Sequence, residues 1–151
     1  MRFTVQTDYA LRMLMYLALH QGKPCRVSDV ASSYRISRNH LMKVALRLGR
    51  LGYVNTARGR TGGIALARCP QDINLGEVVR NMEDDFALME CMRADGGRCL
   101  ISPVCRLKGV VGKAMAAFLA VFDRFTLADI AGNRSELVRL LEMSRGFGTA
   151  A

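Results

Sequence analysis

The stretch from residue 27 to residue 67 constrains the fold most, because it predicts two short capped helices followed directly by a hairpin. Ser28 is expected to cap a helix over 29–34, and Ser37 is expected to cap the next one. Two helices joined by a turn of about three or four residues are typical of a helix-turn-helix. The second helix is expected to bury a stripe made of Leu41, Val44, Ala45, Leu48 and Leu51.

The hairpin is predicted by two short runs that keep the period-two spacing of strands, 53–58 and 64–67. The glycines between them permit the positive φ angles that a tight turn needs. A hairpin placed directly after a helix-turn-helix indicates a winged-helix DNA-binding domain, which we expect over residues 1–70. Its first helix is expected to begin at a Thr7 cap and to end near His20.

The excess of positive charge lies entirely in this first half of the chain. The formal net charge is +9, yet residues 1–68 hold twelve Lys and Arg against two acids, and the remainder holds ten against eleven. Such asymmetry favours a polyanion, double-stranded DNA, as the partner, and a solvated basic face without a partner is the alternative. We expect groove and phosphate contacts from the second helix and from the hairpin: Ser37, Arg38, Asn39, His40, Lys43, Arg47, Arg58 and Arg60.

The second half of the chain predicts further helices around one irregular segment. Asn74 is expected to cap a helix over 75–84, and no clear periodicity follows over 85–102. Pro103 is expected to open a long helix that ends near Phe125 and measures roughly 35 Å. Shorter helices are expected to follow it, one starting at Thr126 or Asp129 and one from Ser135 to about Glu142, with a frayed tail from Ser144.

The long helix carries apolar residues at helical spacing: Leu107, Val111, Ala114, Phe118, Phe122 and Phe125. Too little chain remains to cover this stripe, so we expect a second copy of the helix to cover it in a homodimer, which would read an inverted repeat. Packing wholly within its own chain is the alternative. The expected fold is mainly α with a small β-hairpin wing. It divides into four parts. These are the winged helix-turn-helix domain over 1–70, a connecting helix with a loop over 71–106, a long dimerisation helix over 103–125, and short C-terminal helices with a frayed tail over 126–151.

Three of the five cysteines, Cys91, Cys99 and Cys105, fall within fifteen positions of one another, in the irregular segment and the start of the long helix. Thiolates are soft ligands that suit zinc, copper(I) and iron–sulfur clusters. Gaps of seven and five residues are wider than the two-residue gaps of a zinc ribbon, which favours a cluster over one zinc ion. Zinc, redox-active thiols and cysteines without a special role remain open. Cys25 and Cys69 are interpreted as structural.

Membrane and enzyme functions are disfavoured. The longest unbroken apolar run, 114–122, has nine residues, whereas a membrane-spanning helix needs ~20. Asp8 and Arg12 interrupt the apolar stretch that a signal peptide would require, so the cytoplasm is the expected compartment and no membrane partner is expected. The sequence holds no Ser-His-Asp, paired-carboxylate or phosphate-loop arrangement, and we expect no enzyme.

Several segments resemble the Rrf-type winged-helix transcriptional regulators. The resemblance rests on TDYALR at 7–12, LGRLGYV at 48–54 and RGRTGG at 58–63. The run CLISPVCRLK at 99–108, with FTLADI at 125–130, is similar to the nitric-oxide-sensing iron–sulfur repressors of this family. The resemblance covers nearly the whole chain up to about residue 142.

This resemblance implies a homodimeric repressor whose iron–sulfur cluster, [4Fe-4S] in the intact form, controls DNA binding and is destroyed by nitric oxide. The implied ligands are Cys91, Cys99 and Cys105, with Asp8 reaching across from the partner subunit. An acid in the first turn of a helix is also favoured by the helix dipole without any metal. Three cysteines and one oxygen would equally hold [2Fe-2S].

Three alternatives stay open. The first is a regulator of iron–sulfur cluster assembly. Related regulators of that kind use a histidine shortly after the third cysteine as the fourth ligand, and residues 106–108 of this chain contain no histidine. A thiol–disulfide regulator would join Cys99 to Cys105. A zinc-stabilised DNA-binding module would have no sensing role.

Overall fold

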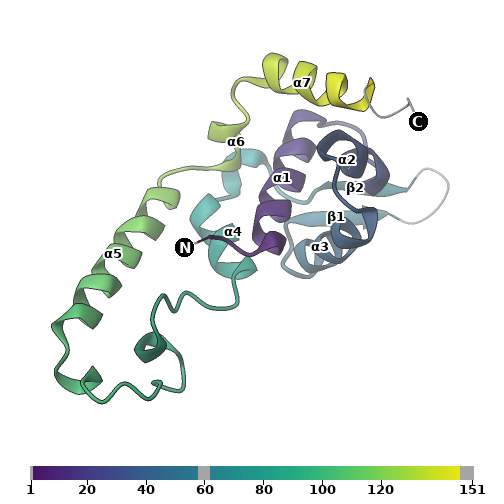
Figure 1. Cartoon of the computed structure of the whole chain (residues 1–151). Helices are drawn as coiled ribbons and strands as arrows, with labels where there is room; N and C mark the ends of the chain where they lie inside the picture. Colours follow the sequence, from purple (N-terminus) through teal and green to yellow (C-terminus); the bar gives the residue numbers. More distant parts are fainter. Residues whose placement is uncertain (1, 58–61, 147–151) are drawn as a thin grey trace.

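The computed structural model describes residues 2–57 and 62–146, and Figure 1 shows their arrangement. It confirms the predicted fold class, mainly α with one two-stranded antiparallel hairpin. The helices and strands are α1 (Val5–Leu19), α2 (Val27–Tyr34), α3 (Arg38–Arg50), β1 (Val54–Ala57), β2 (Gly63–Leu66), α4 (Leu75–Met82), α5 (Arg106–Phe122), α6 (Leu127–Ile130) and α7 (Arg134–Gly146). Short 3₁₀ turns lie at Pro70–Asp72, Glu90–Met92 and Ser102–Val104. None of the described helices is long and apolar enough to cross a membrane.

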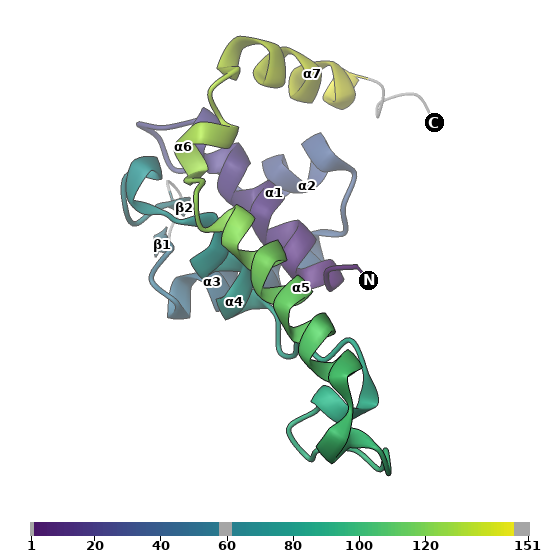
Figure 2. The same ribbon diagram turned by 90° about the vertical axis from the view of Figure 1, so that its left-hand side faces the viewer.

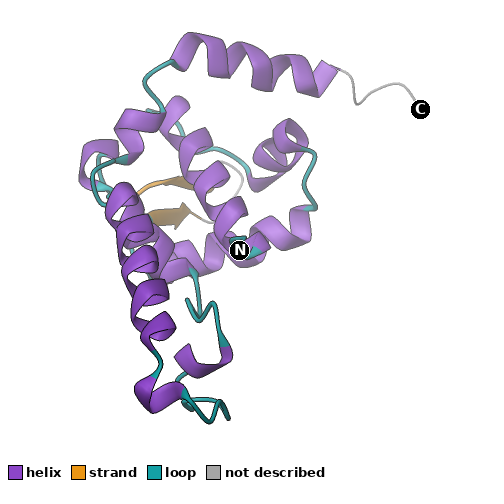
Figure 3. Ribbon diagram, turned by 60° about the vertical axis from the view of Figure 1, so that its left-hand side comes forward, coloured by secondary structure: helices purple, strands orange, loops and turns teal. Residues whose placement is uncertain are grey.

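Helices α1 to α4 and the hairpin form one body, from which α5 projects (Figures 1 and 2). Helix α1 lies at the centre of this body, since it contacts α3, α4, α6, α7 and β2. The hairpin packs against α1 and α3, and Figure 3 shows it as a small β element among the helices. The far end of α5 carries the irregular loop, whereas the other end returns the chain to α6 and to α7, which contacts α2.

Two helices begin earlier than the sequence predicts. Helix α1 is capped by Thr4, whose Oγ1 accepts a hydrogen bond from the backbone N–H of Thr7 at 3.3 Å, so Thr7 lies buried inside the helix. Helix α2 begins one residue before the predicted cap Ser28, and the backbone N–H of Arg26 donates to the Asp29 carboxylate at 3.3 Å. The predicted caps are therefore wrong. Several polar residues stand close together at both places, and spacing alone does not show which of them caps.

The helix-turn-helix and the start of α3 are as predicted. Arg35 takes the left-handed conformation, with a φ of 53°, which ends α2 and turns the chain toward α3. Ser37 is the N-cap residue of α3, although its side chain makes no capping hydrogen bond. Gly52, with a φ of 75°, follows the end of α3. The predicted apolar stripe is confirmed, because Leu41, Val44, Ala45 and Leu48 are buried and Leu51 packs half-buried against the core.

The hairpin is joined to the turn that precedes α2. Strands β1 and β2 pair in antiparallel register, and Cys25 adds a third short segment. The Cys25 N–H donates to the Ile64 carbonyl, and the Ile64 N–H donates to the Cys25 carbonyl, both at 2.8 Å. Gly63 is required beside this contact, because a Cβ there would lie 2.7 Å from the Cys25 carbonyl oxygen. These contacts agree with a structural role for Cys25.

A joint between α4 and the end of α5 fixes where α5 leaves the body. Asn74 caps α4 as predicted, since its Oδ1 accepts from the Glu77 N–H at 3.0 Å. The Asn74 side-chain amide also donates to the Asp123 carbonyl at 2.8 Å. The Arg80 guanidinium donates to both oxygens of the Asp123 carboxylate, at 2.5 and 2.8 Å. Gly76 must lack a side chain here, because a Cβ would overlap that carboxylate.

Helix α5 is shorter than the sequence predicts. It spans Arg106–Phe122, which gives a length of about 25 Å instead of about 35 Å. Pro103 does not open it but belongs to a 3₁₀ turn. Cys105, whose ψ of 113° is extended, separates that turn from the helix and is its N-cap residue. A proline at the start of a helical turn is compatible with a 3₁₀ turn as well as with an α-helix, and the sequence does not distinguish the two.

The C-terminal helices are tied back to the body. Thr126 and Asp129 cap α6 reciprocally, and the Thr126 N–H, which donates to the Asp129 carboxylate at 2.7 Å, lowers the pKa of Asp129. Helix α7 continues past the predicted end near Glu142. The Ser144 hydroxyl donates to the Ser33 carbonyl on α2 at 2.5 Å. Residue 144, where we expected the tail to fray, therefore lies in the helix.

The Arg80–Asp123 pair predicts a loss of stability in acid. The Arg80 hydrogen bonds hold the pKa of Asp123 below its ordinary value, so the pair stabilises the folded chain fully above pH ~4 and progressively less as the pH falls through the lowered pKa. We expect Asp123→Asn to be less stable at neutral pH and to decline less steeply below pH ~4. Chemical unfolding at fixed protein concentration measures both, with Asp72→Asn as an exposed control. Parallel pH curves for the wild type and Asp123→Asn would contradict this account.

Candidate nucleic-acid interface and cysteine loop

Helix α3 presents a basic face to solvent. Its apolar stripe is buried and α3 packs against α1, so the residues between the stripe positions point outward. No acidic residue lies on α3. Its exposed residues are Arg38, Asn39, His40, Met42, Lys43, Leu46 and Arg50. A face with these cations and donors attracts polyanions.

The predicted contact residues occupy the N-terminal half of this face. Five of them are exposed: Ser37, Arg38, Asn39, His40 and Lys43. The free backbone N–H groups at the start of a helix add positive potential at the same place. The His40 ring lies beside α1, with its centroid 6.3 Å from that of Tyr9. The predicted wing contacts, Arg58 and Arg60, lie outside the described residues.

Arg47 differs from the other predicted contacts, because protein acceptors already engage its guanidinium. One Nη donates to the Asn81 carbonyl at 3.1 Å and to the Asp84 carboxylate at 2.8 Å. The other Nη donates to the Gln6 amide oxygen at 3.3 Å. The structure therefore places Arg47 as a tether between α3, α1 and the end of α4, with a side chain that is still 30% exposed.

The sequence analysis missed the polar residues of β1 that continue this face. Asn55 and Thr56 are exposed, and together with Leu46 and Arg50 they line a groove of about 390 Å³ between α3 and β1. Val54 is buried at the start of the same strand. Polar residues directly after a buried strand position are the signal that would have identified this part of the face.

The loop between α4 and α5 is closed upon itself. The Glu90 carboxylate accepts a hydrogen bond from the backbone N–H of Arg98 at 2.9 Å. Gly97, with a φ of 62°, passes so close to Glu90 that a Cβ would lie 2.6 Å from the Glu90 carbonyl oxygen. Cys91 and Cys99 each follow one side of this contact in the sequence. The loop thereby brings together two of the three cysteines that the sequence singles out.

A second turn leads from this closed loop to the third cysteine. The Cys99 carbonyl accepts from the Ser102 N–H at 3.1 Å, and the Ser102 carbonyl accepts from the Cys105 N–H at 3.5 Å. Cys91 is buried, Cys99 is exposed and Cys105 is half-buried, and all three are free thiols. As N-cap residue of α5, Cys105 lies at the positive end of that helix, which favours an anionic ligand set.

The chemistry of these donors suits an iron–sulfur cluster, because thiolates are its usual protein ligands. Within residues 2–57 and 62–146, no group of three or more His, Cys, Asp or Glu side chains is arranged so that it could hold a metal ion. The three thiols lie in the segment between α4 and α5, and a metal site there would still need them to converge with a fourth donor. The exposure of Cys99 and the position of Cys105 leave the loop open to such a donor from outside it.

Asp8 lies on α1, in the helical body, and the structure does not join it to the cysteines of its own chain as a metal site. Its carboxylate accepts a hydrogen bond from Arg12 Nε at 2.9 Å in a half-exposed ion pair. The Arg12 guanidinium also lies over the Tyr34 ring, 5.9 Å from its centroid. Burial raises the pKa of Tyr34 to about 12, and the nearby Arg12 cation opposes part of that rise.

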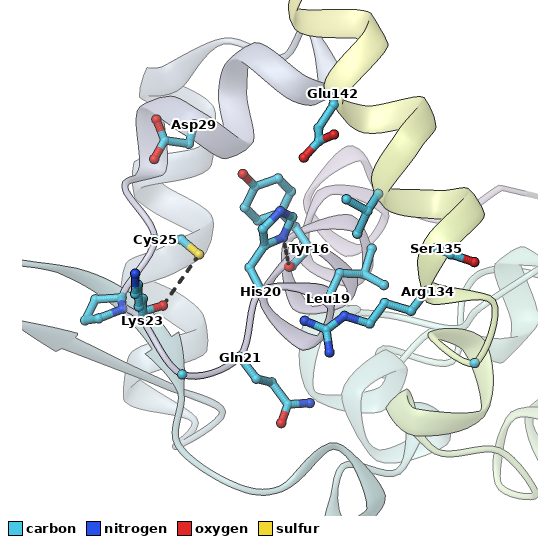
Figure 4. Close-up of a pocket in the computed structure, with 14 residues that line it drawn as sticks. Tyr16, Leu19, His20, Gln21, Lys23, Cys25, Asp29, Arg134, Ser135 and Glu142 are labelled. Carbon is cyan, nitrogen blue, oxygen red and sulfur yellow. Dashed lines mark hydrogen bonds between the residues drawn. The ribbon is translucent and has the colours of Figure 1, made fainter.

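A cavity of about 980 Å³ lies elsewhere, between the end of α1, the following turn and α7 (Figure 4). His20 lies at its centre, stacked on Tyr16 with ring centroids 4.1 Å apart, and its Nδ1 is 2.8 Å from the Tyr16 carbonyl oxygen. The lining mixes cations such as Arg134 with acids such as Glu142, which favours no one class of ligand. Asp8 is separated from His20 by about three turns of α1.

Comparison with known proteins matches this architecture. The Rrf2 family model, described as an iron-dependent transcriptional regulator, matches residues 3–133. A curated relative, the HTH-type transcriptional regulator NsrR of Bacillus subtilis, is 51% identical over 144 residues, which cover 95% of this chain and 99% of the relative. The predicted resemblance to Rrf-type winged-helix regulators is thereby confirmed.

Two solved structures share the fold. IscR from T. potens superposes with a TM-score of 0.69 at 24% identity, covering 100% of this chain and 93% of that one. CymR, the global cysteine regulator of B. subtilis, superposes with a TM-score of 0.63 at 24% identity, covering 87% of this chain and 97% of that one. At these identities the two structures support the winged-helix architecture alone.

Proposed function

The chain belongs to the Rrf2 family of transcriptional regulators, and on that premise we propose that it is a repressor that binds an inverted-repeat operator as a homodimer. One observation supports DNA as the partner above all: the exposed face of α3 holds cations and hydrogen-bond donors and no acid. In a helix-turn-helix this helix enters the major groove, and the hairpin that follows is placed to reach the neighbouring backbone or minor groove.

Helix α5 supports the homodimer. Met115 is the one buried residue of α5, and three of its large apolar side chains are exposed, namely Leu107, Val110 and Val121. On the body side, the Phe3 ring packs against Phe118 and holds α5 to the start of α1. A second copy of α5 would cover the exposed side chains and relate the two α3 helices by a twofold axis.

The cysteine loop supports a sensing role. Cys91, Cys99 and Cys105 would hold an iron–sulfur cluster, most simply [4Fe-4S], and Asp8 from the partner subunit would supply the fourth ligand. When bound, the cluster would supply an iron site that reacts with nitric oxide. The curated relatives named NsrR, with 41–51% identity, favour this role over control of iron–sulfur assembly.

The residues of the chain provide a route from the loop to α3. Arg12 Nε donates to Oδ1 of Asp8 at 2.9 Å, so ligation through Oδ2 would leave this ion pair in place and Arg12 would orient the ligating carboxylate. The loop follows directly from Asp84, which Arg47 joins to α3 at 2.8 Å. Release of the thiolates would free the loop, and Asp84 would carry that change to the orientation of α3.

Lys43 and Arg47 are expected to behave differently in DNA binding. Lys43→Ala removes an exposed cation, so the salt dependence of operator binding should flatten by about 0.9 per subunit if Lys43 meets a phosphate. Arg47→Ala should leave that slope unchanged and should destabilise the chain by about 1 kcal/mol, because it removes a partly exposed tether. Binding titrations at several salt concentrations, with chemical unfolding, measure the two effects. An Arg47→Ala slope that falls like that of Lys43→Ala would place Arg47 at the DNA.

The cluster proposal predicts a pattern among the cysteines. Replacing Cys91, Cys99 or Cys105 with Ala should abolish both the iron–sulfur content and cluster-dependent operator binding. Cys69→Ala, which changes an exposed cysteine outside the loop, should retain both. Iron and acid-labile sulfide assays, visible absorption and operator titrations on anaerobic protein provide the readouts. Unaltered binding in the three loop variants would refute the proposal. Colourless protein that holds zinc would instead indicate a zinc-stabilised DNA-binding module. Metal-free protein in which peroxide forms a Cys99–Cys105 disulfide would indicate a thiol–disulfide regulator.

Asp8→Ala is expected to have a milder effect than loss of a cysteine, because water or a thiol would replace one oxygen ligand. The variant should retain iron and sulfide but release DNA at a different concentration of nitric oxide. Operator titrations of the anaerobic protein at increasing nitric oxide measure the change. Arg12→Ala, which leaves the carboxylate in place and removes its partner, is the matched control. Identical nitric oxide responses of Asp8→Ala and the wild type would remove Asp8 from the ligand set.

A further inference from the structure

Two large apolar side chains lie exposed in the middle of the basic face of α3. Met42 is 48% exposed and Leu46 is 56% exposed. They are one helical turn apart, so both belong to a single row that begins at Arg38 and ends at Arg50. The row therefore has a cation at each end and apolar side chains in between.

The neighbours of this row indicate what covers it. Lys43 lies next to it on the exposed face, and no acid of α3 offsets these cations. Leu46 also lines the groove between α3 and β1, whose remaining lining includes the polar residues Asn55 and Thr56. An apolar protein partner would have to bury these cations and polar groups without counter-charges, at a high desolvation cost. A nucleic-acid duplex instead offers phosphates to the ends of the row.

The major groove offers one apolar feature to the middle of such a row, the C5-methyl group of thymine. We propose that Met42 and Leu46 read thymine methyl groups, and that they thereby determine part of the operator sequence. This inference rests on the proposed binding of α3 in the major groove and adds the bases that it reads.

The spacing of the two side chains gives the spacing of the bases. Four residues of α-helix rise by about 6 Å, and successive base pairs are about 3.4 Å apart. For a helix that lies along the groove, the two thymines are therefore about two base-pair steps apart in each half-site. Arg38 and Arg50 then lie near the backbone on either side of them.

Replacement of thymine by deoxyuridine tests the proposal, because it removes the methyl group and keeps every hydrogen-bonding atom. The probe is an operator duplex selected from a random pool with the anaerobic full-length chain. Each thymine is replaced symmetrically in both half-sites, and binding is measured by fluorescence anisotropy at fixed salt. We expect two positions in each half-site, about two steps apart, at which replacement weakens binding by about fourfold per half-site.

Variants assign each methyl group to its reader. Met42→Ala should remove the deoxyuridine penalty at one of the two positions and keep it at the other, and Leu46→Ala should do the reverse. Leu140→Ala, which truncates an apolar side chain 53% exposed on α7, should keep both penalties. All three variants should unfold close to the wild-type midpoint in denaturant, which shows that each is folded.

Each remaining outcome overturns a defined part of the reasoning. If deoxyuridine weakens binding at no position, or weakens it equally in Met42→Ala, Leu46→Ala and the wild type, the inference is wrong while DNA binding stands. If selection enriches no sequence and no duplex binds, the proposed function itself fails. If Met42→Ala and Leu46→Ala lower the assembly mass in the absence of DNA, these side chains belong to a contact between subunits and not to a reading surface.

Discussion

The packing of α1 against α3 is the contact on which the rest of this structure depends. Ala10, Met13 and Leu14 of α1 are completely buried in the core that they share with Leu41 and Leu48 of α3. The apolar stripe of α3 is buried in this core, which leaves the opposite face of the helix exposed, and that face is polar apart from Met42 and Leu46. The basic face of α3 is thus exposed because the apolar face of the same helix is buried in the core.

The two regions proposed for function lie apart, and two sets of polar contacts connect them through α4. The guanidinium of Arg80 holds the end of α5 to α4, and that of Arg47 holds the end of α4 to α3. Neither contact is deeply buried, since Asp84 and Asp123 are both exposed. Exposed ion pairs contribute little to stability but still fix an orientation. Such contacts fix the orientation of α3 relative to α4, and little free energy is needed to break them.

The sequence predicted the fold where local patterns and tertiary packing agree. The stripe of α3, the Asn74 cap and the hairpin all follow from spacing and turn chemistry. Predictions failed where neighbouring polar residues compete to cap a helix, as at the true cap Thr4, and where a proline suits both a 3₁₀ turn and an α-helix, as at Pro103. Arg47 shows a further limit, because its engagement with Asp84 depends on a contact 37 residues away that no local pattern contains. The three cysteines are recognisable from their spacing, whereas their relative placement depends on how Glu90 closes the loop.

The pairing of Cys25 with Ile64 has a consequence for how DNA sites differ from one another. Two backbone hydrogen bonds join β2 to the turn that leads into α2, so the hairpin and the helix-turn-helix move as one rigid unit. In the proposed complex, the described strands of the hairpin would therefore keep one position relative to α3 within each half of a palindrome. Adaptation to palindromes of different spacer length would then fall to the proposed contact between two copies of α5, and such a dimer would tolerate changes in spacer better than changes inside a half.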